Sequence, residues 1–203
     1  MWFHRLCILA AAFFCLMLAV VPSASGQTFF VPEMQFWHND GGDGGTNAIQ
    51  YDMFISTPIG KTGWSFKSWA LHDSTDWGEI YAGLGKQVAP WLELSLQVGF
   101  QHVDAASGRK PWQLASTVYL TDKRGIHQAL LIVEKGDSSH WYKFTWLAKA
   151  RATKYISAGL LIQHTIGVGP LFQLNLGKAH IWSAPVAFGA GGVKNVTGLK
   201  YEF

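Results

Sequence analysis

The chain has only two cysteines, and both lie in its first 26 residues. Without that segment the protein has no thiol, which excludes a cysteine nucleophile, a cysteine metal site and a disulfide scaffold. Long apolar runs are also absent after residue 27, so no later segment predicts a membrane-spanning helix. Charged residues make up 14% of the chain against about 25% in soluble domains, and a net charge of +3 is too balanced to indicate a nucleic-acid partner.

Residues 1–26 have the pattern of a secretory signal peptide. A positive charge precedes the apolar stretch of residues 6–21, and the small residues Ala24 and Gly26 follow it, as signal peptidase requires. The apolar stretch is shorter than the roughly 20 residues that a spanning helix needs, which disfavours the alternative of an uncleaved anchor. We therefore predict that residues 1–26 are removed and that residues 27–203 form one domain.

Alternation of apolar and polar residues is the main pattern after residue 27. Between Leu92 and His102, leucine, valine and phenylalanine alternate with glutamate, serine, glutamine and glycine. A period of two places one set of side chains on each face of a β-strand. Turn residues separate twelve such segments, with expected bounds of 28–38, 47–57, 63–72, 78–87, 91–103, 112–121, 126–135, 140–149, 154–164, 168–176, 179–187 and 194–203.

The two faces of these strands have the composition of a membrane barrel. Their polar faces are small and mixed, as at Ser95 and Gln97, while the opposite faces carry large apolar residues suited to lipid. Hydrocarbon requires every backbone group to be paired within the protein, which a closed sheet achieves. We therefore predict an all-β fold, a closed antiparallel transmembrane β-barrel of about 12 strands. The alternatives are 8 or 10 strands, if weak segments such as 168–176 and 179–187 do not span.

Tryptophans lie near the ends of the expected strands and predict two aromatic girdles at the membrane interfaces. An even strand count places both chain ends on one side, which is the periplasm in an exported barrel. The tryptophans expected at the outer interface are Trp37, Trp77, Trp112 and Trp141, and those at the periplasmic interface are Trp64 and Trp91.

The chain ends in alternating aromatic residues, with a glycine at position 198 and aromatics at positions 201 and 203. This segment resembles the terminal strand signal of Gram-negative bacterial outer-membrane β-barrel proteins, although Val196 departs from the polar residue often found two places before the glycine. The resemblance implies an outer-membrane location, outer-membrane lipids as partners, and recognition by the barrel-assembly machinery. The residues that match this signal are Gly198, Tyr201 and Phe203.

Polar residues expected to face the barrel interior carry charges of both signs. Such an interior either lines a narrow water-filled pore or closes it by salt bridges, and twelve strands lie between the filled barrels of eight and the open channels of sixteen. Since no catalytic motif is recognisable, the leading function is a narrow passive pore for small solutes or ions, without a cofactor. An alternative is a non-conducting structural barrel. The expected interior residues are Glu33, Gln35, Asp52, Lys67, Glu79, Glu93, Gln97, Gln101, Lys143 and Lys200.

Five histidines are expected at the outer strand ends, at His38, His72, His102, His140 and His164. A histidine, an aspartate and a serine at this rim could hydrolyse or transfer acyl chains, which keeps an outer-leaflet lipid enzyme as the runner-up function. Its candidate residues are His102, Asp104 and His140. The same side chains have no fixed short spacing, so we predict no metal site. The loop of residues 39–46 is similar to glycine-rich calcium turns, but it is a single copy without their repeat.

Overall fold

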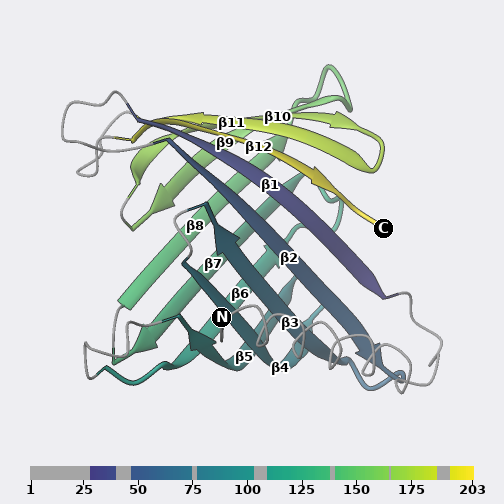
Figure 1. Ribbon diagram of the computed structural model, residues 1–203. Coiled ribbons are helices and arrows are strands. Elements are labelled where there is room, and N and C mark those ends of the chain that lie inside the picture. The colour runs from purple at the N-terminus through teal and green to yellow at the C-terminus, as the bar shows by residue number, and fades with distance from the viewer. Residues whose placement is uncertain are drawn as a thin grey trace.

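The protein folds into a closed barrel of twelve antiparallel strands, shown in Figure 1. The computed structural model describes residues 28–39, 47–74, 77–102, 109–137, 140–164, 166–186 and 193–203. The strands are β1 (Phe29–Asn39), β2 (Ala48–Ile59), β3 (Trp64–Asp73), β4 (Gly78–Ala89), β5 (Leu92–Gln101), β6 (Trp112–Thr121), β7 (His127–Gly136), β8 (His140–Lys149), β9 (Ile156–Gln163), β10 (Gly167–Leu176), β11 (Ala179–Pro185) and β12 (Val193–Tyr201).

This architecture confirms the predicted closed antiparallel barrel and selects twelve strands over eight or ten. The two segments that were weakest in the sequence, β10 and β11, pair with each other and with β9 and β12. No helix within the described ranges is long and apolar enough to cross a membrane. The predicted signal peptide and the loop of residues 40–46 lie outside the described residues.

The barrel closes where the first strand meets the last. In Figure 1, β1 in purple runs beside β12 in yellow, and their register pairs Glu33 with Lys200 and Gln35 with Gly198. The Phe203 backbone N–H donates to the Phe30 carbonyl at 3.0 Å, and the two rings lie 5.5 Å apart between centroids. Closure pairs the two strands that would otherwise be sheet edges, which lets the sheet satisfy its own backbone groups.

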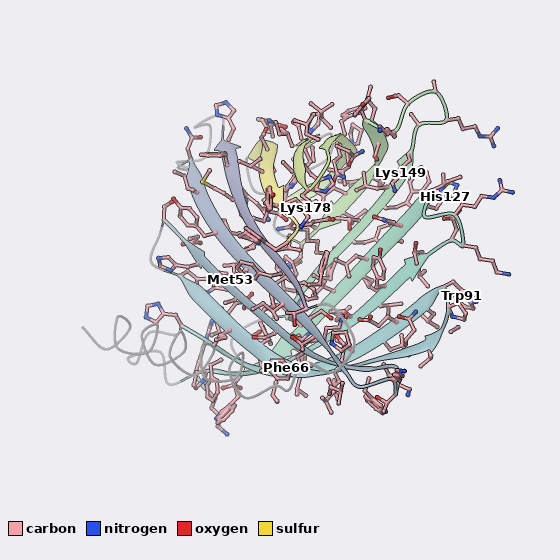
Figure 2. The ribbon with its side chains drawn as sticks, turned by 90° about the vertical axis from the view of Figure 1, so that its right-hand side faces the viewer. Met53, Phe66, Trp91, His127, Lys149 and Lys178 are labelled. Atoms are coloured by element: carbon pink, nitrogen blue, oxygen red, sulfur yellow. The ribbon has the colours of Figure 1, made fainter. Side chains whose placement is uncertain are left out.

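We call the end of the barrel that carries Phe29 and Tyr201 the terminal rim, and the opposite end the distal rim. Figure 2 shows Trp91, His127 and Lys149 together at the terminal rim. Turns there are tight: between β6 and β7, Gly125 has a φ of 62° and donates its N–H to the Asp122 carbonyl at 3.0 Å. Glycine adopts this left-handed conformation without steric cost, so Gly125 allows the tight turn between the two strands.

The barrel has an apolar outer face and an inner face rich in polar side chains, the reverse of a soluble domain. On the outer face, Leu96 is 64% exposed and Trp112 is 56% exposed. On the inner face, Gln35 is fully buried, and Gln97 and Glu134 are each 3% exposed. A continuous apolar exterior of this kind is stable against lipid and unfavourable in water. The chain is therefore a barrel of the membrane type.

The predicted aromatic girdles are only partly correct. Trp64, Trp91 and Trp112 are exposed on the barrel, as expected. Trp37 instead donates its indole N–H to Gln35 at 3.2 Å and packs against the interior apolar cluster. Trp141 stacks on an interior tryptophan of another strand. Both residues occupy inward-facing positions in the alternation, and this overrides their nearness to a strand end.

Candidate functional site in the barrel interior

The interior is built from every second residue of each strand. Among the residues expected to face inward, Gln35, Lys67, Glu79 and Gln97 are buried. Asp52 of β2 accepts hydrogen bonds from the Gln35 side chain at 2.6 Å and from the Gln50 side chain at 2.8 Å. Gln101 of β5 is half-buried and pairs in register with Glu79 of β4. The structure thus brings carboxylates and amides of neighbouring strands into hydrogen-bonded groups.

An ion pair joins Lys67 of β3 to Glu93 of β5 across the intervening strand β4. Both side chains are largely buried, at 8% and 20% exposed. Strand β4 presents Gly85 beneath this pair, and a Cβ there would lie 2.8 Å from Lys67 Cε and 2.7 Å from Ser65 Oγ. The missing side chain therefore leaves the space through which the lysine reaches its partner.

Tyr81 of β4 is the centre of a second polar group. Its hydroxyl donates to Gln113 Oε1 at 2.7 Å and lies 3.2 Å from Glu79 Oε2. The side chain is fully buried, and its ring lies over Gly99, where a Cβ would collide with it. The tyrosine thereby bridges β4 and β6 over the top of β5.

Carboxylates from three other strands face this group. Glu134 of β7 interacts electrostatically with Glu79, Asp52 and Lys143. Asp52 in turn faces Glu33 of β1 and the same Lys143. Acidic side chains from β1, β2, β4 and β7 therefore interact with one another in this part of the interior, and the lysine of β8 interacts with two of them, Asp52 and Glu134.

Two tryptophans meet across the interior. Trp69 of β3 stacks on Tyr81 with ring centroids 5.1 Å apart, and on Trp141 of β8 with centroids 6.5 Å apart. Strands β3 and β8 lie five places apart in the order of the barrel, so the second contact crosses the lumen. The stacked rings narrow the interior at this level.

Strands β9 to β12 carry a buried apolar cluster beside buried polar residues such as Gln163 and Gln173. Trp182 of this cluster donates its indole N–H to Glu33 Oε1 at 3.0 Å. Lys143 Nζ lies 5.9 Å from the centre of the same indole ring. Trp182 thus connects the apolar cluster to the charged residues of the interior. The cluster consists of Leu161, Ile166, Leu171, Trp182, Ala184 and Val196.

A further charged group lies toward the terminal rim. Glu202 Oε1 is 3.7 Å from Lys200 Nζ and 3.4 Å from His180 Nε2. The other ring nitrogen of His180 is 2.9 Å from Asn175 Oδ1. Lys200, which was expected to face inward, therefore has a carboxylate of its own strand end as partner.

Three residues that organise the interior were not among those expected from the sequence: Tyr81, Gln113 and Glu134. Each shares the parity of the inward-facing residues on its strand, and this parity is the signal that would have found them. In β7 the apolar run over residues 129–133 hides that parity, because both faces of the strand are apolar there.

The distal rim does not assemble the candidate catalytic residues. His140 of β8 lies against His164, with ring centroids 5.6 Å apart, and Tyr142 lies 5.4 Å from the same histidine. His102 follows β5, and strands β6 and β7 separate it from His140. Asp104 lies outside the described residues. Over the described part of the chain, no three histidine, cysteine, aspartate or glutamate side chains are grouped as metal ligands.

The residues of the terminal strand signal occupy distinct places. Gly198 lies beneath the Trp182 ring, where a Cβ would collide with the indole. Tyr201 and Phe203 are exposed, with ring centroids 4.6 Å apart. The two aromatics therefore form an outward-facing pair beside the seam where the barrel closes.

Comparison with known proteins places the chain by its fold. No protein-family model and no curated protein matches it. A chain solved in the work "Unveiling the Mechanism Behind the in-meso Crystallization of Membrane Proteins" superposes with a TM-score of 0.58 and 6% identity, over 86% of this chain and 83% of that one. A mutant of Rh. blastica porin gives a TM-score of 0.37 and 8% identity, over 87% of this chain and 99% of that one, a score too low to support an argument. The first likeness is one of fold alone, and with the apolar exterior it identifies this chain as a closed membrane-type β-barrel.

Proposed function

We propose that the chain is an integral outer-membrane barrel of a Gram-negative bacterium and acts as a narrow passive pore for small solutes or ions. The observation that carries this proposal is the reversal of polarity: a twelve-stranded barrel with an apolar exterior holds charged and amide side chains along its interior. Placing such groups inside the barrel costs free energy. A water-filled path for polar solutes would need them as its lining.

The width of the path follows from the side chains that cross it. Trp69, Trp141 and Tyr81 are stacked across the interior, and the Lys67–Glu93 ion pair joins β3 to β5 on the side of Trp69. These side chains would block bulky solutes. The pore that we propose is therefore one for ions and the smallest polar molecules.

Export and assembly follow from the two ends of the chain. We propose that residues 1–26 are removed on export and that the terminal rim faces the periplasm, where both ends of the barrel domain lie. The outward-facing Tyr201 and Phe203, with Gly198, would be the residues that the assembly machinery recognises. Outer-membrane lipids would cover the apolar exterior.

Single-channel recording tests this function. The purified protein, refolded and inserted into a planar lipid bilayer, should give stepwise currents whose size scales with salt concentration. Folding is checked beforehand by the heat-dependent mobility shift of closed barrels on a gel. A folded barrel that stays silent would contradict the pore and favour a structural barrel.

A further inference from the structure

We infer that the terminal rim binds the phosphate groups of anionic phospholipids, and that Lys61, Trp64 and Lys86 form its best-defined contact with them. The inference rests on the proposed membrane location, because lipid must surround the rim for such contacts to form. It does not require that the barrel conduct.

An excess of exposed cations at the terminal rim is the first reason. Every hairpin at this rim, except the one between β4 and β5, carries at least one exposed lysine or arginine. Lysine and arginine side chains are cationic at neutral pH. Among the residues that the structure describes, none of these side chains takes part in an ion pair. They are Lys61, Lys123, Arg124, Arg151, Lys154 and Lys178.

The carboxylates near the terminal rim already have partners within the protein. Glu93 and Glu202 each form an ion pair with a lysine of the barrel interior. Asp122 accepts the backbone N–H of Ile126 at 2.7 Å and so stabilises its own turn. The exposed cations of the hairpins are therefore available to an anion from outside the chain.

The side chain of Lys86 is fixed on the outer face of the barrel, at the edge of its apolar surface. Lys86 pairs in register with Trp64 of β3 and Leu94 of β5, and both of these residues are exposed on the barrel exterior. Its Nζ donates to the Thr62 carbonyl at 2.7 Å and lies 5.0 Å from the centre of the Trp64 ring. The ammonium group is therefore positioned before any ligand arrives.

This ammonium group retains donors for a ligand. It has three N–H bonds, and its hydrogen bond to the hairpin uses one of them. Lys61 lies in the hairpin that holds it, so two cations flank the exposed Trp64 ring. Exposed tryptophans in membrane proteins lie at the level of the headgroups, where lysines also extend their ammonium groups. A phospholipid phosphate at this level meets both cations.

A second cation and aromatic pair lies on the opposite side of the rim. Lys154 Nζ is 5.4 Å from the centre of the Tyr155 ring, and Tyr155 is 52% exposed. This pair precedes β9, which lies six places from β3 in the twelve-stranded ring. Pairs on opposite sides suit a ligand that surrounds the barrel, as a lipid layer does, better than one soluble molecule bound at a single place.

The sequence around the distal turns does not have the same excess of positive charge. It contains aspartates at positions 40, 43, 73, 76, 104 and 137 and cations at positions 109, 110, 135 and 194. Asp137 accepts the backbone N–H of Lys110 at 2.9 Å. Lysines of the distal rim therefore provide a control with the same change in net charge.

Electron spin resonance of spin-labelled lipids tests the inference on the refolded protein in phosphatidylcholine vesicles. At low salt the native barrel should associate with phosphatidylglycerol about threefold more tightly than with phosphatidylcholine, because lysines near the surface attract anionic lipid. Lys61→Gln/Lys86→Gln should lower this ratio to about half. Lys86→Arg should retain it, since a guanidinium also binds phosphate and stacks on an aromatic ring. The distal control Lys110→Gln/Lys135→Gln should lower the ratio less.

Equal association of both lipids with an inserted native barrel would overturn the inference and leave the membrane location intact. An equal loss in the two double variants would contradict the assignment to the terminal rim. Release of labelled phosphatidylglycerol by millimolar inorganic phosphate, at constant ionic strength, would identify free phosphate as the ligand instead of lipid. A barrel that does not insert into vesicles would overturn the membrane location and this inference with it.

Discussion

A lysine scan along the outer face of β5 tests whether the barrel crosses a lipid bilayer. Leu92, Leu96 and Phe100 point to the same side of the strand, and Leu96 lies midway between the other two. A strand rises about 3.4 Å per residue and is tilted by about 40° in membrane barrels, so the outer two positions lie roughly 10 Å above and below Leu96. This distance spans most of an apolar band about 25 Å tall.

The cost of a lysine should follow this depth. We expect Leu96→Lys to lower the free energy of unfolding by about 2–4 kcal/mol, the value for a cation at the bilayer midplane. Leu92→Lys and Phe100→Lys should each cost about 0–1 kcal/mol, because their ammonium groups reach the interface. Denaturant unfolding in phospholipid vesicles, followed by tryptophan fluorescence, measures each value.

The variation of the lysine's cost along β5 distinguishes a barrel in lipid from a barrel in water. Leu96 is 64% exposed. If water surrounded the barrel, a lysine at this position would change the free energy of unfolding very little. A flat profile across the three positions would therefore refute the membrane assignment. A maximum at either end would instead place the lipid band at a different height on the barrel.

Three further changes test other parts of the structure. Lys67→Met should lower the free energy of unfolding by about 3–5 kcal/mol, because it leaves the Glu93 carboxylate without its partner. The Lys67→Met/Glu93→Gln double variant should recover much of this loss in the same denaturant assay. Gly159→Ala should reduce the refolded fraction on a gel, because its Cβ would collide with the Trp146 carbonyl oxygen between β8 and β9, and normal refolding would contradict this packing. Phe203→Ala should reduce the amount of protein recovered in the outer-membrane fraction of cells while refolding in detergent is retained, and unchanged recovery would remove Phe203 from the assembly signal.

Strand positions could be predicted from the sequence because their determinants are local. The expected bounds of β6 and β8, residues 112–121 and 140–149, coincide with those observed. Alternation defines the two faces of each strand, and glycine-containing turns such as the one at Gly125 separate them. Closure and the number of strands follow once every segment pairs with its neighbours.

The organisation of the interior could not be predicted in the same way. Contacts between Trp69 and Trp141 or between Glu134 and Asp52 join strands five places apart, and no local pattern encodes which inward-facing residues meet. Tryptophans near strand ends also misled the prediction of the aromatic girdles. Trp141 lies near a strand end, as a girdle residue would, but its ring points into the interior. Only the closed three-dimensional arrangement distinguishes these two places.

Single-channel recording of the native barrel beside a Trp69→Ala/Trp141→Ala double variant tests most directly whether current flows through this interior. The two rings meet across the lumen, so removing them widens the path without altering a charge. The pore predicts stepwise current in the native protein and a larger unit current in the double variant. A folded double variant that carries no current, or the same current as the native barrel, would contradict a conducting path through the lumen.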